Sequence, residues 1–263
     1  AAGLHFSVAE GLPVHESIKL GGPERERYIG QFVENLERLA RHGVHTVCYN
    51  FMPLFGWIRT ELEQPLPDGS ATLAFHQAAL ERMNPERDVW TLPGWNFSTR
   101  QGEIRTLLGQ YRALGEAGLW NNLRYFLQAV VPEAERLGIR LAIHPDDPPY
   151  SILGLPRIFS TIDDVKSLLA MVDSPANGIC FCAGSFSGRL DNNVVEMFKA
   201  CADRVGFVHL RSTAHDGKGN FYEANHLEGV VDMYGLVKAI IEEQMRRKKA
   251  GRADWRIPFR PDH

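Results

Sequence analysis

The sequence lacks the features typical of secreted, membrane-spanning or nucleic-acid-binding proteins. Its four cysteines do not resemble a disulfide framework in a chain of 263 residues. No uninterrupted apolar run approaches the roughly 20 residues needed to cross a bilayer, and no signal peptide is recognisable. A formal net charge of −3 gives no general attraction to nucleic acid or to an anionic membrane. We therefore expect a cytoplasmic protein that binds neither.

Two common catalytic motifs and all internal repeats are also missing. The segment 184–188 (GSFSG) has Phe186 where a nucleophile elbow needs serine, and it is too short for a phosphate-binding P-loop. The longest basic cluster, 246–249, follows an apolar helical run. Because Lys and Arg in a last helical turn suit the helix dipole, we interpret this cluster as a helix end and not as a binding patch.

What the sequence does contain is a regular alternation of strand and helix patterns. Apolar and β-branched runs predict strands at 4–9, 44–51, 139–144, 178–183, 205–211 and 256–260. Helical periodicity predicts helices at 24–42, 108–137, 162–172, 191–202 and 232–249. Alternation of this kind predicts a parallel sheet with right-handed crossovers, and the length is close to that of one (β/α)8 TIM barrel. The predicted fold class is therefore α/β.

We expect one catalytic domain over residues 1–263. A proline-rich stretch at about 52–105 breaks the alternation and is predicted to be a long irregular insertion, a length typical of functional lids. Only six strands are counted. An eight-stranded barrel would need one more before residue 4 and one more after residue 263, so we expect its first and last strands to be missing from this chain.

Four of the predicted strands end on a residue that can bind a metal. These runs are 141–147 (LAIHPDD), 179–184 (ICFCAG), 207–212 (FVHLRS) and 257–263 (IPFRPDH). The candidate ligands are His144, Cys182, His209 and Asp262. Because side chains alternate along a strand, each is the last residue of its strand that can point inward. The carboxyl ends of barrel strands are where such folds place their chemistry.

Each of these residues alone has an ordinary structural explanation. A lone histidine can be satisfied in a core, a cysteine can act as a small hydrophobe and an aspartate can cap a turn. Four coincidences at equivalent positions favour a shared metal site. Two imidazoles, a thiolate and a carboxylate suit Zn²⁺, Fe²⁺ or Mn²⁺ better than Ca²⁺ or Mg²⁺, which prefer oxygen ligands.

The sequence also resembles the D-mannonate dehydratase family over nearly its whole length and in order. The matching blocks are 14–19 (VHESIK), 47–53 (VCYNFMP), 57–62 (WIRTEL), 66–69 (LPDG), 142–149 (AIHPDDPP), 154–158 (GLPRI), 181–185 (FCAGS), 209–212 (HLRS) and 260–263 (RPDH). Gly56, Ile58 and Ala183 depart from the usual family pattern.

The resemblance implies a xylose-isomerase-like barrel that removes water from D-mannonate to give 2-keto-3-deoxy-D-gluconate in hexuronate (glucuronate) breakdown. It implies Mn²⁺ or Fe²⁺ as the metal, held by the same four residues, and His263 as an acid–base group. We expect D-mannonate as the small-molecule partner and a homodimer or higher homo-oligomer.

Several other polar residues are candidates for contacts with the substrate. Arg260 is expected to neutralise the substrate carboxylate during catalysis. Residues at or just past strand ends are expected to bind the substrate, and they are His15, Asn50, Arg59 and Arg211. For the last two, a structural ion pair is the alternative. Two functional alternatives also stay open: a metal-dependent sugar isomerase or epimerase on the same barrel, and a non-catalytic metal-binding or sugar-acid-binding protein.

Overall fold

The computed structural model of the chain describes residues 3–83 and 101–262. Its centre is a parallel sheet of six strands whose spatial order is their order in the chain. The strands are β1 (Val8–Glu10), β2 (Thr46–Tyr49), β5 (Arg140–Ile143), β6 (Asn177–Cys182), β7 (Val205–His209) and β10 (Phe259–Arg260). The predicted six parallel strands are thus confirmed, although β1, β2 and β10 are shorter than expected.

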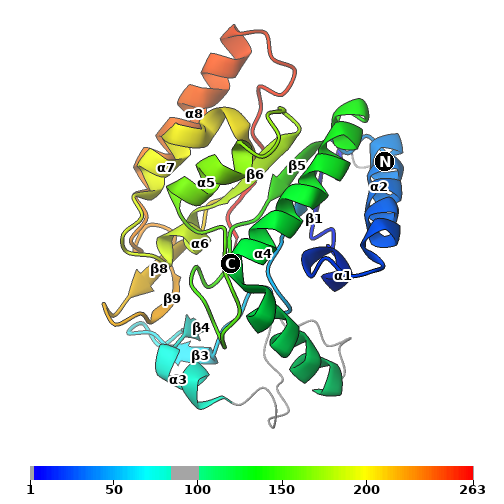
Figure 1. Cartoon of the computed structure of the whole chain (residues 1–263). Helices are drawn as coiled ribbons and strands as arrows, with labels where there is room; N and C mark the ends of the chain where they lie inside the picture. Colours follow the sequence, from blue (N-terminus) through cyan, green and yellow to red (C-terminus); the bar gives the residue numbers. More distant parts are fainter. Residues whose placement is uncertain (1–2, 84–100, 263) are drawn as a thin grey trace.

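Helices lie outside this sheet, as the predicted crossovers require (Figure 1). They are α2 (Arg25–Arg41), α4 (Gln101–Arg136), α5 (Ile162–Leu169), α7 (Val194–Cys201) and α8 (Met233–Lys249). Short helical segments occur at α1 (Glu16–Lys19), α6 (Ala183–Ser187) and η1 (Ala202–Arg204). No helix in the described ranges combines the length and the apolar character that a membrane span needs.

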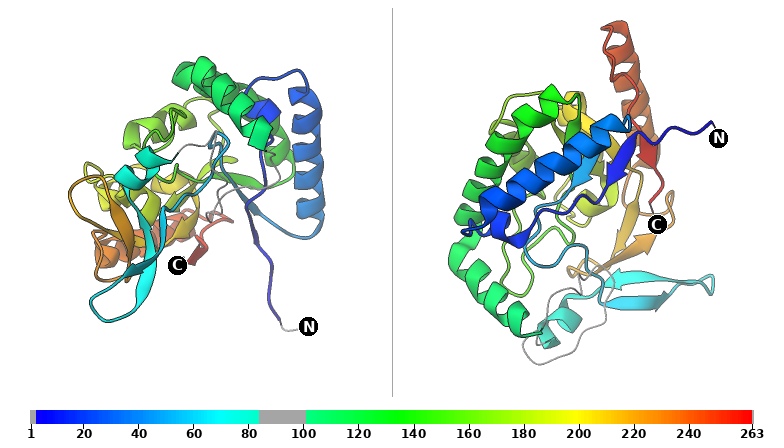
Figure 2. Two further views of the ribbon diagram at one scale, coloured as in Figure 1. Left: turned by 90° about the horizontal axis from the view of Figure 1, so that it is seen from below. Right: turned by 90° about the vertical axis from the view of Figure 1, so that its right-hand side faces the viewer.

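The sheet curls so that its two edge strands approach each other at their carboxyl ends. The guanidinium of Arg260 on β10 donates to the carboxylate of Glu10 on β1, at 3.0 Å between Nη2 and Oε1. A sheet that curls with helices outside it has the architecture of an α/β barrel, and the views in Figure 2 show this curvature. The predicted fold class is confirmed.

The segment 52–105, which we expected to be irregular, contains regular structure. Strands β3 (Glu61–Pro65) and β4 (Ala71–Phe75) form a hairpin, and α3 (Gln77–Arg82) follows them. The hairpin joins β9 (Phe221–Ala224) and β8 (Ser212–His215) in an antiparallel sheet of order β3-β4-β9-β8. β3 is exposed along nearly all its length, so it has no apolar alternation to predict it, and the partner of β4 lies about 150 residues away.

The predicted long helix is two helices joined at a kink. Within α4, Gly115 has φ of 65° and ψ of −177°, a conformation far from helical. A residue with a side chain is strained at such angles, so glycine fits this position. Behind the kink, Phe126 packs edge-on against Phe32 of α2 and Tyr49 of β2, with ring centroids 5.0 and 5.8 Å away. The contact fixes the second half of α4 against the sheet.

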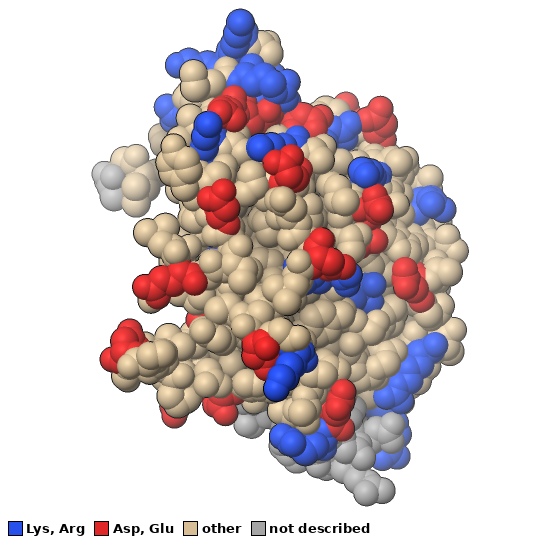
Figure 3. Space-filling model, turned by 90° about the vertical axis from the view of Figure 1, so that its left-hand side faces the viewer, with Lys and Arg blue, Asp and Glu red and all other residues tan. Residues whose placement is uncertain are grey.

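The basic end of α8 belongs to a network of structural ion pairs. Arg247 is fully buried, and its Nη2 donates to the backbone carbonyls of Ala202 and Val205. Glu243 accepts from both Arg246 and Arg247. On the face of the molecule that includes this helix, side chains of both signs are intermixed (Figure 3). The interpretation of 246–249 as a helix end is confirmed.

Candidate metal centre

The structure brings the four predicted ligands together around His209. Cys182, His209 and Asp262 are buried and offer ligand atoms that all lie within 4.8 Å of one another. His144, half-buried just beyond β5, forms a second such group with His209 and Cys180. The rings of His144 and His209 lie 5.2 Å apart. The first and last of these ligands, His144 and Asp262, are 118 positions apart in the sequence (262 minus 144), yet all four segments meet at one place.

Strand alternation explains why these side chains meet. Ala142, Cys180 and Phe207 each precede a candidate ligand by two residues, and together with Cys48 they form one small buried cluster. Side chains two apart on a strand share a face. The cluster is therefore the layer inside the barrel beneath the candidate ligands.

Neighbouring charges control the ionisation of the centre. Burial raises the pKa of the Cys182 thiol, but Arg211 and His144 outweigh it and hold the pKa well below its usual value. Burial lowers the pKa of His209, but its interactions with Cys182 and Glu10 raise it to about 9. Burial also opposes protonation of His144, and the Cys182 charge raises its pKa overall. The thiol and the two imidazoles thus favour each other's charged forms: the cations beside Cys182 favour its thiolate, and the thiolate favours protonation of the rings.

The donor set fits a divalent cation. Nδ1 of His209 is buried without a hydrogen bond, although it lies only 3.4 Å from Oδ2 of Asp262. Nδ1 of His144 lies 2.7 Å from the carbonyl of Pro145, which can only accept, so the neutral ring keeps Nε2 available. Asp262 itself adopts a positive φ of 62°. Sparsely populated backbone conformations of this kind cluster at functional sites.

A buried network of four charges lies beside the centre. Asp147 accepts from Nη1 of Arg59 and from Nη2 of Arg211, both at 2.7 Å. Glu223 on β9 pairs with the same two arginines, bonding to Arg59 and lying 2.9 Å from Nε of Arg211. The last pair is close but not aligned for a hydrogen bond. Burial opposes the charge on Asp147, yet the two guanidinium groups hold its pKa below the usual range.

This network matches the structural ion-pair alternative for Arg59 and Arg211. Both side chains are at most 2% exposed and are enclosed by protein carboxylates. The guanidinium of Arg211 also reaches Cys182, with Nη1 3.7 Å from Sγ, and Ser185 Oγ donates to the same sulfur at 3.2 Å. A Cβ on Gly184 would lie 2.1 Å from Nε of Arg211, so only glycine permits this approach.

Sequence reasoning missed Glu10 and Glu223. Glu10 ends β1, and its Oε1 lies 3.1 Å from Nε2 of His209. It also accepts from Arg260, whose Nη2 lies 2.6 Å from Oδ1 of Asp262. The signal for Glu10 was present, because it is also a polar residue that closes an apolar strand. Glu223 gave no such signal, since it lies on an unpredicted strand.

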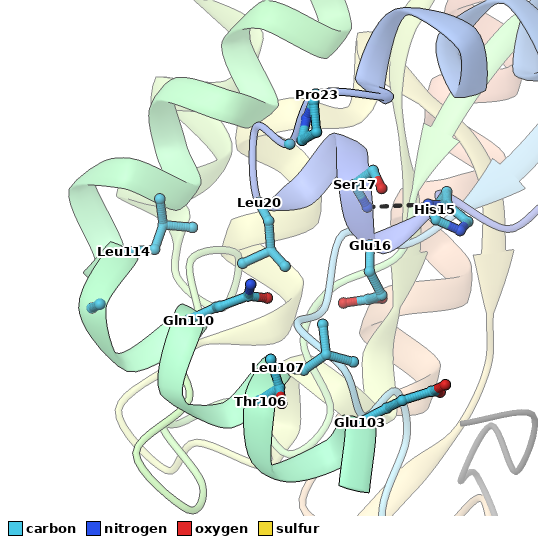
Figure 4. Close-up of a pocket in the computed structure, with 12 residues that line it drawn as sticks. His15, Glu16, Ser17, Leu20, Pro23, Glu103, Thr106, Leu107, Gln110 and Leu114 are labelled. Carbon is cyan, nitrogen blue, oxygen red and sulfur yellow. Dashed lines mark hydrogen bonds between the residues drawn. The ribbon is translucent and has the colours of Figure 1, made fainter. Parts of the chain in front are cut away.

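The remaining predicted site residues are His15, Asn50 and His263, and the two of these that the structure describes are not among the groups of possible metal ligands. His15 caps α1, because its Nδ1 accepts from the backbone N–H of Ser17, and its ring stacks on Tyr28 at 3.4 Å. It borders a hollow of about 960 Å³ between α1 and α4 (Figure 4). Asn50, half-buried just after β2, accepts from the N–H of Met52. His263 lies outside the described residues.

Comparisons with known proteins identify the family of the chain. The family model for D-mannonate dehydratase (UxuA) matches residues 1–263. A mannonate dehydratase of Streptococcus agalactiae serotype V is 42% identical over 271 residues, covering all of this chain and 78% of the relative.

Two solved structures place the fold. The crystal structure of mannonate dehydratase from Streptococcus suis serotype 2 matches with a TM-score of 0.87 and 37% sequence identity. The match covers all of this chain and 69% of the S. suis chain. A D-psicose 3-epimerase from Clostridium cellulolyticum H10, at 12% identity and a TM-score of 0.51, shares the fold alone; the match covers 99% of this chain and 65% of that one. Because the family model spans every residue and the S. agalactiae relative is similar throughout, the chain belongs to the D-mannonate dehydratase family.

Proposed function

We propose that this chain eliminates water from D-mannonate, giving 2-keto-3-deoxy-D-gluconate, with a divalent metal ion held by His144, Cys182, His209 and Asp262. The observation that carries the proposal is the meeting of these four donors at the carboxyl ends of parallel strands. Family membership supports the reaction. A centre with two imidazoles, a thiolate and a carboxylate suits Zn²⁺, Fe²⁺ or Mn²⁺, and of these we propose Mn²⁺ or Fe²⁺, as the family resemblance implies.

The reaction removes the proton on C2 and the hydroxyl group on C3 of the sugar acid. The C2 proton is only weakly acidic, and negative charge develops on the carboxylate as it leaves. When bound, the metal ion supplies Lewis-acid stabilisation of that charge. Hydroxide is a poor leaving group, so a side chain must donate a proton to the C3 oxygen.

Arg260 and His263 are the residues that we propose for these tasks. Arg260 is exposed and lies against Asp262, so its guanidinium can reach a substrate carboxylate beside the centre. His263 follows Asp262 in the chain, and an imidazole titrates nearest to neutral pH. We propose it for one of the two proton transfers.

For the other arginines the geometry supports a different role. We propose that Arg59 and Arg211 hold Asp147 and Glu223, and that Arg211 stabilises the Cys182 thiolate through its charge. His15 and Asn50 stay proposed substrate contacts, and their observed hydrogen bonds are to backbone N–H groups.

An assay for the 2-keto acid tests the proposal. The chain is stripped of metal, reloaded with Mn²⁺ or Fe²⁺ and given D-mannonate. We expect a 2-keto-3-deoxy product that depends on the metal. Isomerisation of a free sugar with no keto acid would instead favour the isomerase or epimerase alternative. Tight metal binding with neither product would favour a non-catalytic protein.

The cellular setting follows from the same proposal. An enzyme that uses D-mannonate would serve hexuronate breakdown in the cytoplasm. A homodimer or higher homo-oligomer is also part of the proposal, and sedimentation of the purified chain tests it directly.

A further inference from the structure

We infer that Glu10 is the residue that positions His209 for metal binding, by holding its ring in one orientation and one tautomer. The inference rests on the proposed metal centre and extends it by one residue that lies outside the four ligands. Glu10 comes from β1, the edge strand that supplies none of those ligands.

The contact between Glu10 and His209 is direct. Oε1 of Glu10 lies 3.1 Å from Nε2 of His209, a distance typical of an N–H···O hydrogen bond. The His209 side chain is 1% exposed, so the ring is shielded from bulk water, whereas the Glu10 side chain is 35% exposed. A carboxylate can only accept, and it therefore requires the proton to be on Nε2.

The other nitrogen of the ring faces the proposed ligands. Nδ1 has no hydrogen bond and lies 3.4 Å from Oδ2 of Asp262. A neutral imidazole carries one proton, so a proton fixed on Nε2 leaves the Nδ1 lone pair available to a metal ion. Ligating histidines in proteins usually donate their second N–H to a carboxylate or a carbonyl in this way.

Two further contacts bear on the ring. Phe207 packs perpendicular to it at 5.0 Å between centroids, which fixes its plane but not which nitrogen faces the metal. Cys180 Sγ lies 3.6 Å from Nε2 and is the competing acceptor. A sulfur atom is a weak acceptor, and the carboxylate oxygen is both closer and stronger.

Glu10 also closes a ring of contacts that includes a second ligand. Its Oε1 accepts from Arg260 at 3.0 Å, and Nη2 of Arg260 lies 2.6 Å from Oδ1 of Asp262 in an ion pair. Asp262 in turn lies beside His209. One carboxylate on β1 thus orients an imidazole on β7 directly and a carboxylate after β10 through Arg260.

The test compares Mn²⁺ affinity among Glu10→Gln, Glu10→Ala and the matched control Cys180→Ala, using the electron paramagnetic resonance signal of free Mn²⁺. We expect Glu10→Ala to weaken binding about 10- to 100-fold. We expect Glu10→Gln to fall between this variant and the unmodified chain, because its amide oxygen still accepts from Nε2 but carries no charge. Cys180→Ala should change the affinity by no more than about twofold.

The visible spectrum of bound Co²⁺ adds a readout that a purely structural role would not move. Its bands should shift in Glu10→Ala and stay in place in Cys180→Ala. Equal Mn²⁺ affinity in the unmodified chain and both Glu10 variants would overturn the inference, as would a larger loss in Cys180→Ala than in Glu10→Ala. If the unmodified chain binds no Mn²⁺, the proposed metal centre itself fails. If Glu10→Ala does not fold, Glu10→Gln decides the comparison.

Discussion

At the scale of single residues, the charge of Cys182 depends on what surrounds it. A buried thiol by itself resists ionisation, and Cys201 shows this, since burial raises its pKa to about 12. Cys182 is just as buried, yet Arg211 and His144 reverse the effect. The thiolate is the form that binds metal ions. The same residue type is therefore inert at one position and a ligand candidate at the other.

Replacing Cys182 separates a catalytic centre from a structural one. We expect Cys182→Ser to lose most Mn²⁺ affinity and nearly all dehydratase activity, because serine does not ionise at neutral pH. The metal-free melting temperature should change by only a few degrees. Cys201→Ser is the matched control, since its hydroxyl can keep the bond that Cys201 makes to the carbonyl of Met197. A Cys182→Ser protein that unfolds would favour a structural metal instead.

The buried charge network predicts a large loss of stability when one partner is removed. Asp147→Asn leaves two buried guanidinium groups facing one carboxylate, that of Glu223. We expect the free energy of unfolding to fall by about 3–5 kcal/mol in urea titrations. Asp163→Asn, which removes an exposed pair with Lys166, is the control and should have little effect.

The same carboxylate gives the chain a defined response to acid. Burial acts against the charge of Asp147, but Arg59 and Arg211 keep its folded pKa below the unfolded value of about 3.9. A depressed carboxyl pKa stabilises the fold above the unfolded pKa, and that stability is lost as the pH falls below it. Between pH 5 and 3, stability should fall less steeply in Asp147→Asn than in the unmodified chain. Parallel slopes would contradict this assignment.

At the scale of elements, the glycines of α4 differ in what they contribute. Gly115 sits at the kink with a positive φ, whereas Gly109 lies in a regular part of the same helix. A Cβ added at either position meets no atom within 4 Å. The two sites therefore differ in backbone conformation and not in available space.

Opposite effects are expected when each glycine becomes alanine. Gly115→Ala should destabilise the chain by about 1–3 kcal/mol, because alanine is strained at these angles. Gly109→Ala should be neutral or stabilising by up to about 1 kcal/mol, because alanine favours the helix. Thermal unfolding of the two variants side by side measures the difference. If both shift in the same direction, the kink is not held by Gly115.

The antiparallel sheet shows why some elements could not be predicted. In the turn between β3 and β4, Asp68 accepts from the backbone N–H of Ser70. The flanking strand β3 has no buried face, and β4 is completed by β9 from far along the chain. Strand propensity depends on packing against such neighbours, so the sequence pattern alone was too weak.

At the scale of the whole molecule, metal binding should be coupled to stability. A ligand that binds only the folded state adds about 2.7 kcal/mol when present at 100 times its dissociation constant. We expect the melting temperature to fall after chelation and to rise again with added Mn²⁺ in a concentration-dependent way. The rise should be smaller at acid pH, because protons compete for the ligands. In the Asp262→Asn variant the rise in melting temperature with Mn²⁺ should largely disappear. A full rise in that variant would exclude Asp262 as a ligand.

The sequence by itself determined the barrel strands, the helices that connect them and the four donors at the strand ends. These follow from local periodicity and from the rule that side chains alternate along a strand, both of which are written in neighbouring residues. Only the tertiary structure decided which polar groups became partners. Glu10 reaches His209 across 199 positions of sequence, and Arg59 is enclosed by carboxylates from two other segments. Ion pairs between distant segments depend on three-dimensional proximity, which no local pattern encodes.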